Sequence, residues 1–247
     1  RFAGVDITKT PVLISPTCHY SMGGLEMADF HTGATRVPGI YTAGEASCVS
    51  VHGANRLGAN SLSEVLVFGK TAGEGAAAYA KEHAYEGSQD ALTAGCTKWK
   101  DRFDKVTARP HMNNRTVPEI RDAMVDTMWF KAGVFRNGPQ LEEAAKELHA
   151  LEEDYKNCFV GDTSHVYNTA FAQYVELGNM LQISHAIVQG AIARKESRGG
   201  HSRRDFPKRD DANFLKHTLI FKKSDGSYAA EYQDVVITKY PPQERKY

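Results

Sequence analysis

The side chains best suited to chemistry lie in one glycine-rich stretch, residues 39–73. Arg56 stands there among small residues, and a guanidinium can hold a carboxylate through two parallel hydrogen bonds, which fixes its direction as well as its charge. Glu45 follows Gly44, a residue type that lets a ligand approach the backbone, and its carboxylate can accept a hydrogen bond from a sugar-like hydroxyl. These residues predict a site for a small carboxylic acid beside a larger, hydroxyl-bearing ligand.

A strand, a loop and a helix must position these residues. Residues 40–42 predict a short strand, and a helix is expected over 61–82. Ser61 followed by Glu64 fits a capping box at the start of that helix. A helix start offers unpaired amides and partial positive charge, which suits an anionic or electron-rich group.

Each of these side chains also has a purely structural interpretation. Arg56 could form an ion pair within the protein, and Glu45 could be a surface carboxylate. His52, Asn55 and Asn60 share the loop, and we expect them to hold its shape through hydrogen bonds to the backbone rather than to contact a substrate.

Seven segments resemble the flavoprotein subunit of succinate dehydrogenases and fumarate reductases. They are spread along the chain from residue 16 to residue 247, so the resemblance extends over essentially the whole chain. They read PTCHYSMGG, VPGIYTAGE, SVHGANRLGANSL, VFGKTAGE, ARKESRGGHSR, FPKRDDANFLKHTL and YPPQERKY. The resemblance implies an FAD enzyme that interconverts succinate and fumarate, with hydride passing between substrate and flavin N5. L-aspartate oxidase, which shares HGANR and NSL-type motifs, is one alternative, and a non-catalytic assembly module of a respiratory complex is another.

The same resemblance assigns substrate binding to His19 and Arg56, which would hold the dicarboxylate. For His19 alone, a structural histidine bonded to backbone would be the simpler interpretation. The family's proton-donating arginine and the histidine that links covalently to FAD are expected upstream, and the chain has no strand–GxGxxG–helix unit. We therefore expect a C-terminal portion that works with a missing N-terminal FAD-binding portion and contains no catalytic residue of its own.

The resemblance also assigns cofactor contacts. Gly44 and Glu45 would meet hydroxyl groups of FAD, and the backbone at Ser61 and Leu62 would meet the isoalloxazine ring. Electrons would pass to an iron–sulfur subunit linked to quinone, and membrane anchor subunits would be indirect partners. The expected location is peripheral on the inner membrane, at the bacterial cytoplasmic face or the mitochondrial matrix face.

The expected fold class is α/β plus α. We expect the end of a capping domain (1–15), the C-terminal part of a Rossmann-like FAD-binding domain (16–85), a three-helix bundle (86–198) and a C-terminal extension with a β-hairpin (199–247). Helical periodicity indicates the bundle helices over 116–131, 141–155 and 166–193, whereas the polar residues 83–98 predict a linker.

The C-terminal quarter carries two further signals. Asp225-Gly226 stands between alternating segments and predicts a hairpin turn. Residues 194–211 form the most charged segment, and their mixed signs predict a salt-bridged loop. Within it, residues 198–201 could approach the cofactor side or a docking face.

Composition sets limits on the function. Thirty basic residues balance thirty acidic ones, so bulk charge gives no case for a nucleic-acid partner. The four cysteines lack CxxC spacing, which argues against an iron–sulfur or zinc site, and no metal site is expected. The sequence also has no apolar run near the length that a bilayer requires.

Overall fold

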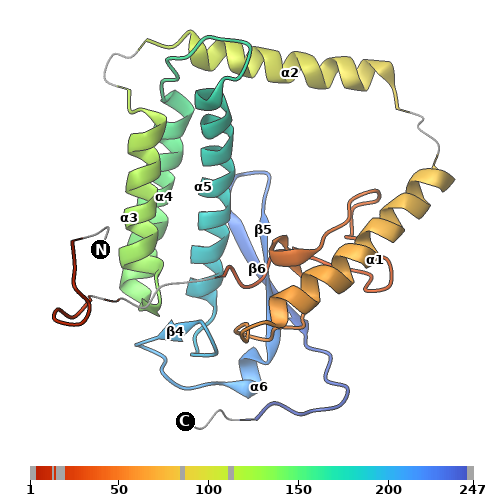
Figure 1. Ribbon diagram of the computed structural model, residues 1–247, viewed down its shortest axis with the longest axis vertical. Helices are drawn as coiled ribbons and strands as arrows, with labels where there is room; N and C mark the ends of the chain where they lie inside the picture. Colours follow the sequence, from red (N-terminus) through yellow and green to blue (C-terminus); the bar gives the residue numbers. More distant parts are fainter. Residues whose placement is uncertain (1–3, 13, 15–19, 84–86, 111–113, 244–247) are drawn as a thin grey trace.

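The computed structural model describes residues 4–12, 14, 20–83, 87–110 and 114–243 (Figure 1). Its helices are α1 Asn60–Glu82, α2 Gln89–Thr107, α3 Val117–Ala132, α4 Gly138–Asn157, α5 Thr169–Ala193 and the short α6 Asp211–Phe214. Its strands pair two by two: β1 Leu25–Glu26 with β2 Ser47–Cys48 in parallel, β3 Phe135–Arg136 with β4 Ser202–Arg203 in parallel, and β5 Lys216–Lys222 with β6 Tyr228–Asp234 antiparallel. The described chain is thus a mixed fold of helices and small sheets.

Helices α3, α4 and α5 lie side by side and enclose the main hydrophobic core (Figure 1). Ile120, Leu148 and Leu181, one from each helix, are almost completely buried. Helix α3 begins with a capping box in which Thr116 and Glu119 bond each other's backbone N–H groups. The predicted bundle of helices is therefore present, with the third helix beginning at Thr169 rather than at residue 166.

The prediction of a linker over 83–98 is wrong. Helix α2 already begins at Gln89, and the Ser88 hydroxyl accepts a hydrogen bond from the Ala91 amide to cap it. In Figure 1 one end of this helix lies at the end of the bundle and the rest extends away from it, and Val106 is its buried residue. Its polar, glycine-containing sequence suits a solvent-exposed helix as well as a linker, so composition did not separate the two.

The strand expected at residues 40–42 is also wrong. Tyr41 forms an isolated bridge with Ala34, and a 3-10 turn follows over Gly44–Ala46. The two-residue strand β2 comes just after that turn and pairs with β1. Residues 40–42 therefore form a single bridge followed by a turn, not a regular strand.

The C-terminal hairpin is confirmed. Strands β5 and β6 flank the predicted turn, where Gly226 has a φ of +84° and the Asp225 carboxylate accepts a hydrogen bond from the Ser227 amide at 2.8 Å. The hairpin lies between the bundle and the segment before α1 (Figure 1). It is tied to that segment by a 2.9 Å hydrogen bond between Ser50 Oγ and His217 Nε2.

The charged segment 194–211 forms the salt-bridged loop that its sequence predicts. Glu196 is fully buried and pairs with Arg194 and Arg198, and Arg198 also pairs with Asp211. Burial opposes ionisation of Glu196, but hydrogen bonds from Arg198, the Asp210 amide and Arg194 outweigh it and hold its pKa below the usual value. The loop is therefore held together by ion pairs.

None of the helices in the described ranges is long and apolar enough to cross a membrane.

Candidate functional site

The loop between β2 and α1 presents Arg56 with its charge uncompensated. Its Nη1 donates a 2.6 Å hydrogen bond to Ser61 Oγ, and its Cζ lies 4.5 Å from the centroid of the Tyr20 ring. Across the described residues, no carboxylate lies within ion-pair distance of this guanidinium, whereas Arg36 and Arg203 each pair with an acid. Ser61 and Tyr20 thus orient the group without neutralising it, which leaves it able to bind an external carboxylate.

The start of α1 differs from the predicted capping box. The N-cap residue is Ala59, in a left-handed conformation with a φ of +67° and no side-chain cap. Glu64 therefore stands two positions beyond the place where a capping glutamate would reach the N-cap amide. Its Oε1 instead accepts a 3.0 Å hydrogen bond from the Gly44 amide, while Ser61 Oγ accepts from Arg56.

Buried polar side chains lie between this loop and α1. The Glu64 carboxylate is nearly inaccessible, and its Oε2 lies 3.8 Å from His52 Nε2. His52 Nδ1 lies 3.0 Å from the Asn60 side-chain nitrogen, which can donate a hydrogen bond to it. His52 and Asn60 thus connect the loop to α1, chiefly through a bond between their side chains rather than through the backbone bonds that the sequence predicted; Asn60 Nδ2 also lies 3.5 Å from the Val51 carbonyl.

Gly44 and Glu45 lie in the 3-10 turn that contacts α1 through the bond from the Gly44 amide to Glu64. The Glu45 carboxylate is exposed, and its Oε1 accepts a 2.7 Å hydrogen bond from the Ser21 amide. This bond connects the segment just after His19 to the 3-10 turn. His19 itself lies outside the described residues, so its predicted contact with substrate stays a prediction.

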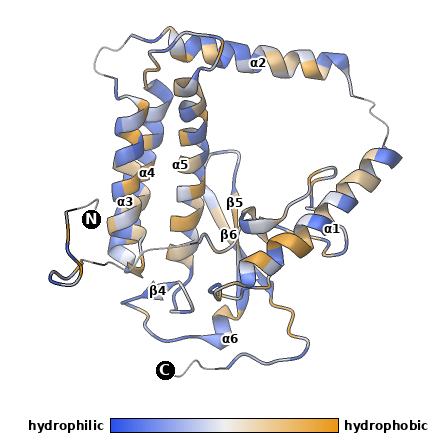
Figure 2. Ribbon diagram, in the orientation of Figure 1, coloured by the Kyte–Doolittle hydropathy of each residue, from blue (hydrophilic) through white to orange (hydrophobic). Residues whose placement is uncertain are grey.

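The first two turns of α1 carry an exposed apolar surface beside Arg56. Leu62 and Leu66 are 68% and 73% exposed, and Figure 2 shows apolar residues gathered in this half of the helix. The Leu62 amide donates to the Ala59 carbonyl at 3.2 Å, so the Ser61 amide is the better donor for a ligand at the helix start. An apolar surface next to helix N-terminal amides suits a planar ring with a polar edge.

The ion-paired loop docks onto the loop that carries Arg56. The Gly200 amide donates a 3.0 Å hydrogen bond to the Ala54 carbonyl, and Gly199 adopts a φ of +58° against the same residue. His201 is fixed behind them between Arg136 and the Arg194 carbonyl. The sequence only suggested that residues 198–201 could approach this side, and neither the Ala54 contact nor the role of Tyr20 was predicted.

A separate open cleft of about 750 Å³ runs along α2. Its lining includes Arg102, Arg109 and Tyr174 but none of the predicted site residues. It is therefore not the site that the loop around Arg56 forms.

Comparisons with known proteins show which family the chain belongs to. Residues 121–247 match the family described as "Fumarate reductase flavoprotein C-term", and residues 1–62 match the family described as "FAD binding domain". The chain belongs to the succinate dehydrogenase and fumarate reductase flavoprotein family. The second match assigns FAD as its cofactor, and the residues around the start of α1 fit such a group because they combine exposed apolar surface, a helix N-terminus and the exposed Glu45 carboxylate.

Individual relatives show the same likeness. The chain is 43% identical over 246 residues to the 8-methylmenaquinol:fumarate reductase flavoprotein subunit of Wolinella succinogenes and 40% identical over 248 residues to the fumarate reductase flavoprotein subunit of Escherichia coli. Each alignment covers 100% of this chain and 40% of the relative. A solved quinol fumarate reductase of E. coli superposes with a TM-score of 0.88 at 39% identity, over 98% of this chain and 41% of that one. The chain thus spans about two fifths of the length of the flavoprotein subunits that it matches.

Proposed function

We propose that this chain supplies the dicarboxylate clamp and one side of the flavin pocket in an FAD enzyme that interconverts succinate and fumarate. The observation that carries the proposal is the Arg56 guanidinium, which is oriented by Ser61 and Tyr20 and has no acidic partner among the described residues. A charged group held in this way costs little to reorganise when a carboxylate arrives. The names of the relatives give fumarate as their substrate, and fumarate carries a carboxylate at each end.

The residues of this chain would orient the substrate. Arg56 would hold one carboxylate through two hydrogen bonds, and His19 would donate a hydrogen bond to the same diacid. When bound, FAD would supply the hydride exchange with a substrate carbon. Holding the diacid in a fixed direction removes much of the entropy that the reacting atoms would otherwise lose, and this is the main contribution that we assign to Arg56.

The start of α1 would form one side of the flavin pocket. The Ser61 amide and the positive end of the helix would favour negative charge at the ring edge, and Leu62 would pack against the ring. Gly44 and Glu45 would contact hydroxyl groups of the cofactor. In this proposal residues 16–85 complete a Rossmann-like domain whose remainder lies in another portion of the protein.

The partners follow from the same proposal. The N-terminal FAD-binding portion would supply the proton-donating arginine and the covalent histidyl link. An iron–sulfur subunit would take the electrons, and membrane anchor subunits would hold the assembly at the inner membrane. The relatives' names describe flavoprotein subunits, which supports an assembly of several chains.

Substitution of Arg56 in the complete, FAD-loaded enzyme tests the proposal. Arg56→Lys keeps the charge but loses the paired hydrogen bonds, each worth about 1.5–3 kcal/mol when charge-assisted. We therefore expect kcat/KM for succinate and fumarate to fall at least ~100-fold, with normal flavin content. Ser61→Ala should cause a smaller loss of about 10-fold, because it removes one hydrogen bond that orients Arg56.

The matched control is Arg121→Lys, which changes an exposed arginine on α3. This variant should leave kcat/KM unaltered. If Arg56→Lys retained kcat/KM within about twofold of the parent enzyme, the clamp would be refuted.

A further inference from the structure

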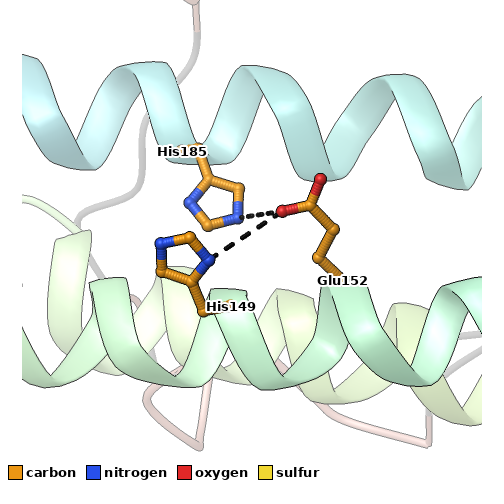
Figure 3. A group of neighbouring side chains, drawn as sticks. All are labelled: His149, Glu152 and His185. Atoms are coloured by element: carbon orange, nitrogen blue, oxygen red, sulfur yellow. Dashed lines mark ion pairs between the residues drawn. The ribbon is translucent and has the colours of Figure 1, made fainter. Parts of the chain in front are cut away.

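Three metal-ligating side chains converge between α4, α5 and the hairpin, away from the loop that carries Arg56. His149 and Glu152 project from α4 one turn apart, and His185 projects from α5 toward them (Figure 3). Glu152 Oε2 lies 3.5 Å from His185 Nε2 and 4.0 Å from His149 Nδ1. All three ligand atoms lie within 4.8 Å of one another.

His185 is the buried member of this group, and its ring nitrogens are unsatisfied. Its side chain is 0% exposed, and neither ring nitrogen makes a hydrogen bond within the described part of the chain. A buried polar atom without a partner costs about 1–3 kcal/mol, so native structures seldom keep one without a reason. A bound metal ion would give one of these ring nitrogens a partner, because imidazole nitrogen is a common metal ligand.

We propose that His149, Glu152 and His185 bind a divalent transition-metal ion of the Zn²⁺ class. Zn²⁺ takes imidazole nitrogen and carboxylate oxygen at about 2.0–2.2 Å in a tetrahedral arrangement, which places ligand atoms about 3.3 Å apart. The Glu152–His185 separation of 3.5 Å is already close to this value, whereas the 4.0 Å to His149 and the separation of the two imidazole nitrogens, at most 4.8 Å, must shorten on binding. His149 is 60% exposed, so its ring is free to make that adjustment.

A water molecule on the exposed side of the cluster would complete the coordination of the ion. Since three protein ligands leave one tetrahedral position open, water would fill it from the solvent side near His149. Two imidazoles and one carboxylate favour Zn²⁺ over Ca²⁺ or Mg²⁺, which prefer all-oxygen ligand sets. The ion would join two helices of the bundle through His149, Glu152 and His185.

The hairpin modulates the site. Lys222 of β5 lies 3.3 Å from Glu152 Oε1, the oxygen that does not face the histidines, and the Tyr228 ring stacks on His185 with centroids 5.4 Å apart. The ammonium group holds the carboxylate in place but repels a second cation nearby. Lys222 should therefore weaken metal binding, and its removal should tighten it.

The sequence-based expectation of no metal site considered cysteine spacing alone. The relevant signal was a histidine and a glutamate three residues apart on a helix, which places both side chains on one face. The third ligand comes from the next helix, 33 positions after Glu152 in the printed sequence. Only packing of α4 against α5 brings it near.

Metal titration of the complete protein tests the proposal. After removal of bound metal with a chelator, Zn²⁺ alone is titrated by calorimetry, and the zinc retained after gel filtration is measured by mass spectrometry. We expect one Zn²⁺ per chain at this site. His149→Ala should weaken its binding by more than the roughly 10–100-fold that loss of an outer-shell partner causes, because a direct ligand is lost.

Two further variants sharpen the test. His31→Ala removes an exposed histidine outside the cluster and should bind Zn²⁺ as the parent does, whereas Lys222→Gln should bind it more tightly. His149 is exposed, so its substitution disturbs the fold less than substitution of the buried His185. Equal Zn²⁺ affinity in the parent and His149→Ala, or no retained zinc in the parent, would overturn the site. Unchanged affinity in Lys222→Gln would contradict the geometry assigned to Glu152.

Discussion

Substitution of Gly199 by alanine should displace the loop that carries Arg56. A Cβ at Gly199 would lie 2.3 Å from the Ala54 carbonyl oxygen, and ordinary contact begins near 3.4 Å. The two loops must therefore separate by about 1 Å, which would also break the hydrogen bond from Gly200 to Ala54. Because Arg56 is two residues from Ala54, the guanidinium should move with the loop.

The magnitude follows from three terms. The left-handed φ of +58° costs alanine about 1–2 kcal/mol, and the lost hydrogen bond costs about 1 kcal/mol. A misplacement of about 1 Å at a positioning group can cost about 100-fold in rate. We therefore expect Gly199→Ala to lower kcat/KM for fumarate by about 10- to 100-fold and to lower the free energy of unfolding by about 2–3 kcal/mol.

The assay is steady-state dicarboxylate turnover by the complete enzyme, together with thermal unfolding. Gly226→Ala is the matched control, because Gly226 also has a positive φ, +84°, but no atom lies within 4 Å of its would-be Cβ. The control should lose about 1 kcal/mol of stability and no activity. Equal activity in Gly199→Ala and the parent enzyme would refute the coupling between the two loops.

Three other predictions concern stability and thiol reactivity. Burial lowers the pKa of His201 to about 4, so the free energy of unfolding should fall as pH drops from about 6.5 toward 4. The expected loss is about 2 kcal/mol after allowance for solvent screening. Urea unfolding of His201→Gln should therefore depend less on pH than that of the parent protein. Asp205→Asn should cost about 3 kcal/mol in urea unfolding, because it leaves the buried Arg203 without its paired carboxylate; a loss under about 1 kcal/mol would contradict this. A maleimide should label the exposed Cys96 well before the buried Cys158, whose pKa burial raises to about 11, and the reverse order by peptide mapping would be inconsistent with the fold.

Local sequence signals predicted the bundle and the hairpin because their determinants lie within a few residues. The capping box at Thr116 and Glu119 sets the start of α3, and Asp225 with Gly226 sets the hairpin turn. The same reasoning failed at α1, where Ser61 and Glu64 have the spacing of a capping box but bond to Arg56 and Gly44 instead. The partner of Ser61 is five positions away and that of Glu64 is 20 positions away, so the spacing of a capping box identifies neither of them.

The candidate site was predicted in its residue types but not in its supports. Arg56 was identified from its loop and from the family resemblance, whereas the ring that stacks on it comes from Tyr20 and the loop that braces it from Gly199 and Gly200. Such contacts depend on how separate segments pack. A glycine pair inside a charged loop was the one available hint of close backbone approach.

Arginine footprinting by mass spectrometry tests the central claim most directly. The complete enzyme is treated with an arginine-selective dicarbonyl reagent with and without saturating succinate, and modification of Arg56 is compared with that of the exposed Arg121. The account predicts that succinate protects Arg56 and leaves Arg121 unchanged. Equal modification of Arg56 in the presence and absence of succinate would contradict it.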